Sequence, residues 1–147
     1  MGERILIATE SRMIGGAFPS FFRKHLPEAE IVVAEDVGRT VSVVAGSHLD
    51  LVMIDEFLAR SLINGLKVVN GCDQGSDVTL IHHVCWLLRG PRSRRTKIAI
   101  TAESSVLSNR TSREYLMLLS LSQYCDAFIP IPCKGIANYV RKMLAAP

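Results

Sequence analysis

Leu51-Val52-Met53-Ile54-Asp55 decides the fold, because four apolar residues are followed directly by a carboxylate. A short continuous apolar run is typical of a strand that is buried on both faces of a parallel sheet. Two further apolar runs end in the same manner, one at Glu10 and the other at Thr101. The sequence therefore places Glu10, Asp55 and Thr101 at the ends of three predicted strands, where an open parallel sheet gathers its chemistry.

The remaining sequence alternates strand and helix patterns. Continuous apolar runs predict five strands, at Arg4–Ala8, Glu30–Ala34, Asp50–Ile54, Lys97–Thr101 and Ala127–Ile131. Apolar residues at helical spacing predict helices at Met13–Leu26, at Val37–Ala45, from Ser76 or Asp77 to Leu88, from Thr111 or Ser112 to Ser122, and at Gly135–Leu144. This alternation predicts a doubly wound α/β fold with a five-stranded parallel sheet in the flavodoxin-like order 2-1-3-4-5.

The stretch that follows Asp55 is longer than this fold requires. A βαβ unit takes about 30 residues, and the chain between Asp55 and Thr101 exceeds that length by roughly a dozen residues. The surplus lies between Glu56 and Gln74, where Asn-Gly pairs indicate turns. Long loops in compact domains are usually functional or mobile, so this extended loop either covers the site or forms a contact surface.

Length and composition indicate one globular domain over residues 1–147. The chain is 48% hydrophobic and 21% charged, with a formal net charge of +3. Its basic cluster between Arg89 and Lys97 contains no aromatic residue, so we expect a solvated loop and no nucleic-acid partner. The absence of an apolar stretch of about 20 residues and of a leader at MGERILIATES predicts no membrane partner. Four cysteines without a metal or disulfide spacing indicate a cytoplasmic protein with reduced thiols.

Glu10 and Asp55 form a candidate metal site. In the strand order 2-1-3-4-5 they stand at the ends of neighbouring strands, and neighbouring strands lie about 4.8 Å apart. Two carboxylates at that separation can share one hard cation, and Mg²⁺ binds through one or two carboxylates while it keeps several waters.

At these residues the sequence resembles the receiver domain of bacterial response regulators, over nearly the whole chain. The resemblance implies that Asp55 is the phosphoacceptor, that Glu10 belongs to the acidic pair that holds Mg²⁺, and that Thr101 contacts the phosphoryl group. It also implies that Phe128 is the aromatic switch residue on the fifth strand. Two positions depart from the family pattern and make this an atypical receiver or a pseudo-receiver: Thr9 replaces the second acid, and Ile131 replaces the lysine.

The resemblance implies a single-domain signalling protein that receives a phosphoryl group on Asp55 from a histidine kinase or a phosphotransfer protein. It would act on a downstream protein partner without an output domain, and its enzymatic activity would be at most this self-catalysed phosphoryl transfer. Homodimerisation through the fourth helix, fifth strand and fifth helix would involve Tyr115, Tyr139 and Arg141. Two alternatives stay open: a binding module that has lost phosphorylation, and a small-ligand-binding or enzymatic flavodoxin-like domain.

Structural roles compete with these readings. Asp55 also suits the cap of a turn, and Phe128 also suits the core. Lys134, three residues after Ile131, is a weaker candidate to replace the lysine. A metal site of Cys72, His82, His83 and Cys85 is a weaker prediction still, because of these residues only His82 and Cys85 share a helical face.

Overall fold

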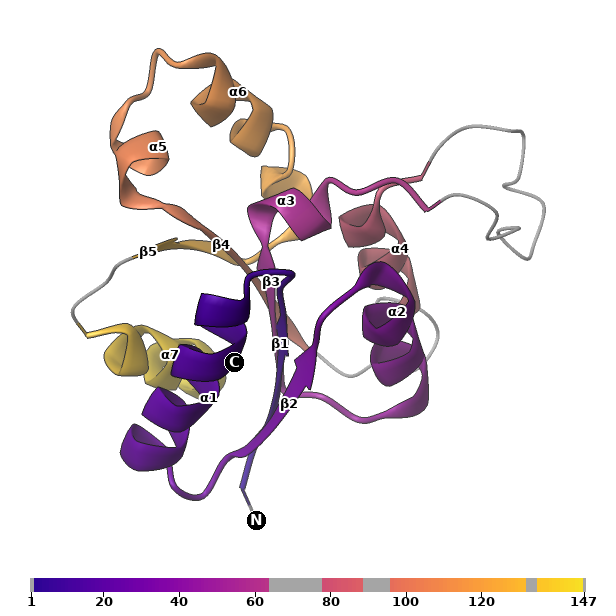
Figure 1. Ribbon diagram of the computed structural model, residues 1–147, viewed down its shortest axis with the longest axis vertical. Helices are drawn as coiled ribbons and strands as arrows, with labels where there is room; N and C mark the ends of the chain where they lie inside the picture. The colour runs from indigo at the N-terminus through magenta and orange to yellow at the C-terminus, as the bar shows by residue number, and fades with distance from the viewer. Residues whose placement is uncertain (1, 64–77, 89–95, 132–134, 147) are drawn as a thin grey trace.

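The fold is that of a computed structural model, which describes residues 2–63, 78–88, 96–131 and 135–146 (Figure 1). Its five strands form one parallel sheet in the order β2-β1-β3-β4-β5, which confirms the predicted topology. The strands and the predicted runs agree to within two residues. The strand bounds are β1 Arg4–Ala8, β2 Glu30–Ala34, β3 Leu51–Asp55, β4 Lys97–Glu103 and β5 Ala127–Ile131.

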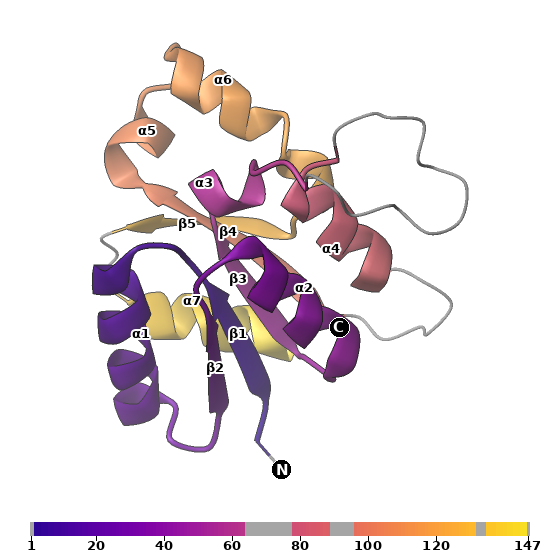
Figure 2. The same cartoon turned by 45° about the vertical axis from the view of Figure 1, so that its right-hand side comes forward.

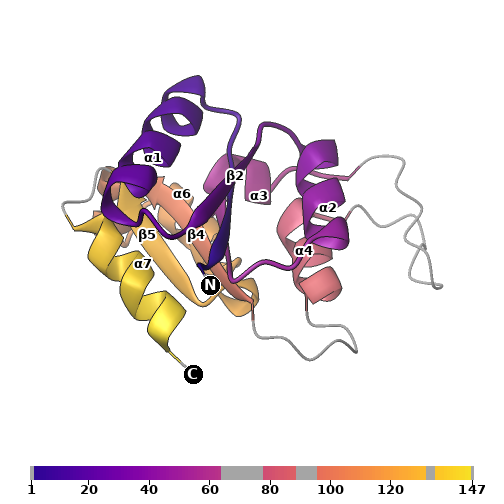
Figure 3. The ribbon, with the colours of Figure 1, turned by 90° about the horizontal axis from the view of Figure 1, so that it is seen from below.

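Helices cover both faces of the sheet, as right-handed crossover connections require. Helices α1 and α7 lie on one face, and α2 and α4 lie on the other (Figure 3). Short helices stand beyond the carboxyl ends of the strands, around the end of β3 (Figure 2). The helix bounds are α1 Arg12–His25, α2 Val37–Gly46, α3 Glu56–Ala59, α4 Leu80–Leu88, α5 Ser104–Ser108, α6 Arg113–Leu119 and α7 Ile136–Ala145, with a 3₁₀ turn η1 at Ser122–Tyr124.

Two apolar clusters fill the spaces between the sheet and its helices. Successive side chains of a strand point to opposite faces, so each central strand supplies both clusters. In β3, Leu51 and Met53 pack on the α1–α7 side, whereas Val52 and Ile54 pack on the other side. All four are at most 1% exposed, which is why the run reads as continuously apolar.

The helices α2 and α6 show how burial and helix ends are distributed. In α2, Val43 and Val44 are buried, whereas Ala45 is exposed. Thr40 is also buried, because its hydroxyl donates a hydrogen bond of 2.7 Å to the Asp36 carbonyl and so needs no water. In α6, Ser112 caps the helix as predicted, but the helix ends at Leu119, which is 43% exposed.

The stretch after β3 begins with a helix that the sequence pattern did not predict. α3 occupies only four residues, and a short pairing then joins Leu62 to Thr79 across an isolated bridge. The Ile63 N–H donates to the Val78 carbonyl at 2.8 Å, so the two sides of this stretch lie next to each other. The greater part of the predicted loop, from residue 64 to Gln74, and the predicted helix start at Ser76 or Asp77 lie outside the described residues.

Polar side chains bind the amino ends of neighbouring strands together. The Asp50 carboxylate, just before β3, accepts a hydrogen bond of 2.8 Å from the backbone N–H of Arg4 in β1. The Asp126 carboxylate, just before β5, accepts one of 2.8 Å from the N–H of Ile98 in β4. In the described residues, no helix is long and apolar enough to cross a membrane.

Candidate functional site

Asp55 is the last residue of β3 and also the cap of α3. Its Oδ1 accepts a hydrogen bond of 2.9 Å from the backbone N–H of Phe57, as an N-cap carboxylate does. The two interpretations of Asp55 from the sequence, as a site residue and as a turn cap, are thus compatible in one geometry. The side chain is half-buried, which leaves it accessible from the carboxyl end of the sheet.

Thr101 stands beside Asp55. The two residues are register partners in the pairing of β3 with β4, so their side chains point to the same face of the sheet. Thr101 is 4% exposed and Ala102 is 3% exposed. The strand pairing therefore brings together the carboxylate and the hydroxyl that the sequence predicted to share a site.

Glu10 follows β1, the other neighbour of β3. Ala8 of β1 pairs with Ile54, so the chain leaves β1 next to Asp55, and the Glu10 side chain is exposed there. Thr9 is 2% exposed, and its hydroxyl accepts a hydrogen bond of 3.0 Å from the Ser11 N–H. At this position a buried hydroxyl in a local turn replaces an acidic ligand.

The charges around Asp55 oppose one another. Burial raises the pKa of its carboxyl, and the negative charge of Glu10 raises it further. Backbone N–H groups of Phe57 and Leu58 and the positive charge of Arg60 act in the opposite direction without cancelling the increase. Asp55 is thus a carboxylate in an acidic, partly dry setting, which favours an added proton, cation or neutralising partner.

Glu56 and Arg60 extend this site, and the sequence analysis missed both. Glu56 is 4% exposed, and its Oε2 lies 3.8 Å from Nη2 of Arg60 one turn later in the chain. Burial raises the pKa of Glu56, while Arg60 lowers it and nearby carboxylates raise it. The i, i+4 spacing of a glutamate and an arginine is the sequence signal for this pair, but it falls in a stretch that the sequence pattern predicts to be a loop.

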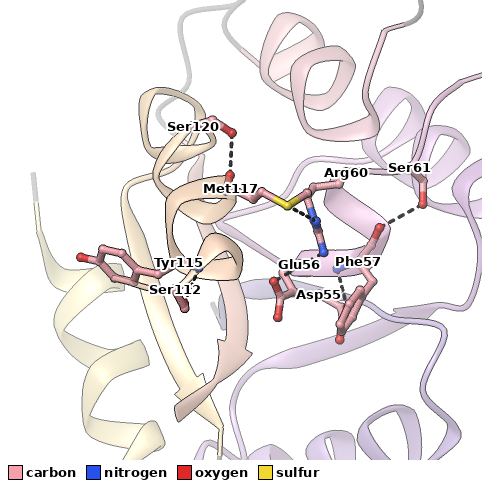
Figure 4. A network of polar contacts seen from close by, with 9 residues as sticks. All are labelled: Asp55, Glu56, Phe57, Arg60, Ser61, Ser112, Tyr115, Met117 and Ser120. Atoms are coloured by element: carbon pink, nitrogen blue, oxygen red, sulfur yellow. Dashed lines mark hydrogen bonds and ion pairs between the residues drawn. The ribbon is translucent and has the colours of Figure 1, made fainter. Parts of the chain in front are cut away.

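Arg60 also connects α3 to α6. Its Nη1 donates to Sδ of Met117 at 3.7 Å, and its guanidinium lies 5.3 Å from the centre of the Phe57 ring. Figure 4 shows the Arg60 side chain between Glu56, Phe57 and Met117, close to Asp55. The segment after Asp55 is thereby linked to a helix that lies about 60 residues later in the sequence.

Phe128 and Ile131 lie on β5, which β4 separates from the strand of Asp55. Phe128 pairs with Ile100 and is half-buried against the cluster that includes α4, on the opposite face of the sheet from Thr101. Its role as a switch residue stays a prediction. Ile131 pairs with Glu103 and offers an apolar side chain where the resemblance leads us to expect a lysine. Lys134 lies outside the described residues.

The donors at this edge of the sheet fit Mg²⁺ in chemical type. Glu10 and Asp55 supply carboxylate oxygens from neighbouring strands, close enough for the charge of Glu10 to raise the pKa of Asp55. They are two acids rather than three, because the position before Glu10 holds Thr9, whose hydroxyl accepts from the Ser11 N–H. A site with fewer charged ligands should bind the ion more weakly.

The two histidines of α4 make other contacts. The His82 ring lies 5.4 Å from that of Tyr124, and His83 stacks on Trp86 at 5.8 Å. Cys72 is outside the described residues, within which no group of three His, Cys, Asp or Glu side chains could hold a metal ion.

Solved structures of receiver domains share this fold. The receiver domain of a sensor histidine kinase from Pseudomonas aeruginosa, solved with magnesium in its active-site cleft, is 13% identical with a TM-score of 0.65, over 99% of this chain and 100% of that one. A CheY-like receiver domain protein from Methanospirillum hungatei is 15% identical with a TM-score of 0.59, over 98% and 94%. The chemotaxis protein CheY4 of Vibrio cholerae is 11% identical with a TM-score of 0.60, over 97% and 99%.

The likeness is one of structure. No protein-family model matches the sequence, and no curated protein matches it either. The chain therefore has the doubly wound fold of response regulator receiver domains, with a sequence far from theirs.

Proposed function

We propose that residues 1–147 form a receiver-type signalling domain in which Asp55 accepts a phosphoryl group from a histidine kinase or a phosphotransfer protein. The modified domain then acts in the cytoplasm by binding a downstream protein partner. The observation that carries this proposal is the pairing of Asp55 with Thr101 at the carboxyl ends of β3 and β4, with Glu10 close enough to influence Asp55.

The chemistry is a transfer between two nucleophiles. The N–P bond of the donor phosphohistidine breaks, and its electron pair returns to the imidazole nitrogen. A lone pair of the Asp55 carboxylate forms the new O–P bond, so an acyl phosphate results without any change of oxidation state. Thr101 would donate its hydroxyl hydrogen to a phosphoryl oxygen. Mg²⁺, held by Glu10 and Asp55, would supply positive charge that neutralises the transferring group.

Phosphorylation with a small donor tests the proposal directly. Purified protein is incubated with acetyl phosphate and Mg²⁺, and the intact mass is measured with and without mild base. We expect one base-labile phosphoryl adduct in the wild type and none in Asp55→Asn. Glu10→Gln should need a higher Mg²⁺ concentration for the same yield, because one carboxylate ligand is lost.

Asp50→Asn is the matched control, since Asp50 is a half-buried aspartate at the opposite end of β3. It should be modified like the wild type. An adduct that persists in Asp55→Asn, or a wild type that stays unmodified, contradicts the proposal.

A binding module without phosphorylation is the second candidate. Three observations favour it. Ile131 carries no positive charge, and the Thr9 hydroxyl accepts a local hydrogen bond from Ser11. The Asp55 carboxylate already caps α3. For this candidate the wild type forms no adduct, and Asp55→Asn leaves binding to its partner unchanged.

A homodimer through α6, β5 and α7 remains a prediction. Tyr139 is 46% exposed on α7 and is available for such a contact, whereas Arg141 is engaged with the His25 carbonyl at 2.6 Å. Light scattering with and without acetyl phosphate measures the association, and Tyr139→Glu should weaken it.

The ligand-binding or enzymatic reading receives less support. Cavities of about 230 and 350 Å³ are found in the described chain, and both lie at the amino end of the sheet beside α7. Neither includes Asp55, Thr101 or Glu10.

A further inference from the structure

Arg60 turns back towards Asp55 from the far end of α3. Its backbone N–H donates to the Glu56 carbonyl at 3.1 Å, which closes the single turn of this helix. Its side chain then reaches Glu56 and Phe57, the two residues that directly follow Asp55. Long side chains of a helix lean towards its amino end, so this direction is the expected one. The guanidinium therefore lies beside the two residues that directly follow Asp55 (Figure 4).

The present partners of Arg60 hold it weakly. The nearest Glu56 oxygen is 3.8 Å from Nη2, beyond hydrogen-bond distance, and the contact to Met117 is a weak one to a thioether sulfur. Its Nε is buried and has no hydrogen-bond partner in the described part of the chain. A guanidinium is best satisfied by a planar or tetrahedral anion that accepts two hydrogen bonds from it at once. Among the described residues, neither of the contacts of Arg60 with Glu56 and Met117 is of this kind.

The site needs a positive charge if it is modified. A phosphoryl group adds about −1.5 to −2 charges next to Glu10 and Glu56. Ile131 cannot neutralise them. The guanidinium of Arg60 contacts Glu56 and Phe57, which directly follow Asp55, so a positive charge already stands beside the residue to be modified.

We propose that Arg60 binds the phosphoryl group on Asp55 and supplies there the positive charge that Ile131 cannot. The inference rests on the proposed phosphorylation of Asp55 and adds a binding residue to it. On binding the phosphoryl oxygens, the guanidinium leaves Glu56 and Met117. α6 then loses its contact with α3, and the modification is transmitted to the surface of α6.

Beryllofluoride, a non-covalent analogue of the phosphoryl group, tests this inference with Mg²⁺ present. The protein carries ¹³C-methyl methionine, and the Met117 methyl resonance, assigned with Met117→Leu, is followed during the titration. We expect wild-type protein to bind and its Met117 resonance to shift. Arg60→Gln should bind about tenfold more weakly, with no Met117 shift beyond its own starting position. Arg60→Lys, which keeps the charge but loses the two-pronged donor, should lie between them.

Arg23→Gln is the matched control, because Arg23 is an exposed arginine at the end of α1 far from the site. It should behave as the wild type, and circular dichroism checks the fold of each variant. Equal binding by wild type, Arg60→Gln and Arg60→Lys overturns the inference and leaves the proposed function standing. A wild type that does not bind, or Asp55→Asn that binds as tightly as the wild type, overturns both.

Discussion

The helices α6 and α7, which precede and follow β5 in the sequence, are packed to different extents. α7 buries Ile136 and Val140 in the cluster that also contains Phe22 of α1. α6 buries Leu118 and exposes Leu116 by 58% and Met117 by 43%. α7 is thus anchored in the core, whereas α6 is held by few buried side chains. Met117 of α6 contacts Arg60 beside the candidate site, so we expect a charge change at the site to affect α6 more than α7.

The largest expected effect on the free energy of unfolding comes from comparing one side chain of α7 with one of α6. Ile136→Ala removes a residue that is 5% exposed and should lower the free energy of unfolding by about 2–5 kcal/mol. Leu116→Ala removes one that is 58% exposed and should change it by less than about 0.5 kcal/mol. Urea unfolding followed by circular dichroism measures both. Similar losses in the two variants would mean that α6 is packed as firmly as α7.

The caps of α6 and α2 offer a smaller test. The Ser112 hydroxyl accepts a hydrogen bond of 3.0 Å from the Tyr115 N–H, and the Asp36 carboxylate accepts one of 2.7 Å from the Arg39 N–H. Either residue changed to alanine should lose about 1 kcal/mol of unfolding free energy. The effect on local opening of the helix should differ, because α6 has fewer buried residues than α2 to hold its first turn in place. Hydrogen exchange at the α6 amides should accelerate more in Ser112→Ala than exchange at the α2 amides does in Asp36→Ala.

The smallest expected effect is a dependence of stability on pH. Burial raises the pKa of Asp55 and of Glu56 above their ordinary values of 3.8 and 4.5. The folded protein therefore binds protons more readily than the unfolded chain. This contribution is complete below the ordinary pKa values and is lost as pH rises through the raised ones.

The double variant Asp55→Asn, Glu56→Gln lacks this loss, so its stability relative to the wild type should increase as the pH rises above the ordinary pKa values of these two groups. Urea midpoints at a series of pH values measure the difference. A difference that stays constant over this range shows that these two carboxyls do not carry the effect.

The strand order and the strand bounds could be predicted, because fully buried strands such as β3 leave an unbroken apolar signal. The pairing of Asp55 with Thr101 followed from that order. The part played by Glu56 and Arg60 could not, since a helix of four residues is too short to show a period. Glu56 looks like an ordinary loop acid in the sequence, whereas the structure shows it buried with an arginine beside it.

Asp50 and Asp126 have a consequence for the site at the other end of the sheet. Each ties the start of its own strand to one particular backbone N–H on the neighbouring strand, Arg4 for Asp50 and Ile98 for Asp126. A shift of strand pairing by one residue would turn every side chain of that strand to the opposite face. These two carboxylates thus help to decide, a full strand length away, that Asp55 lies beside the end of β1 and that Thr101 keeps its place between β3 and β5.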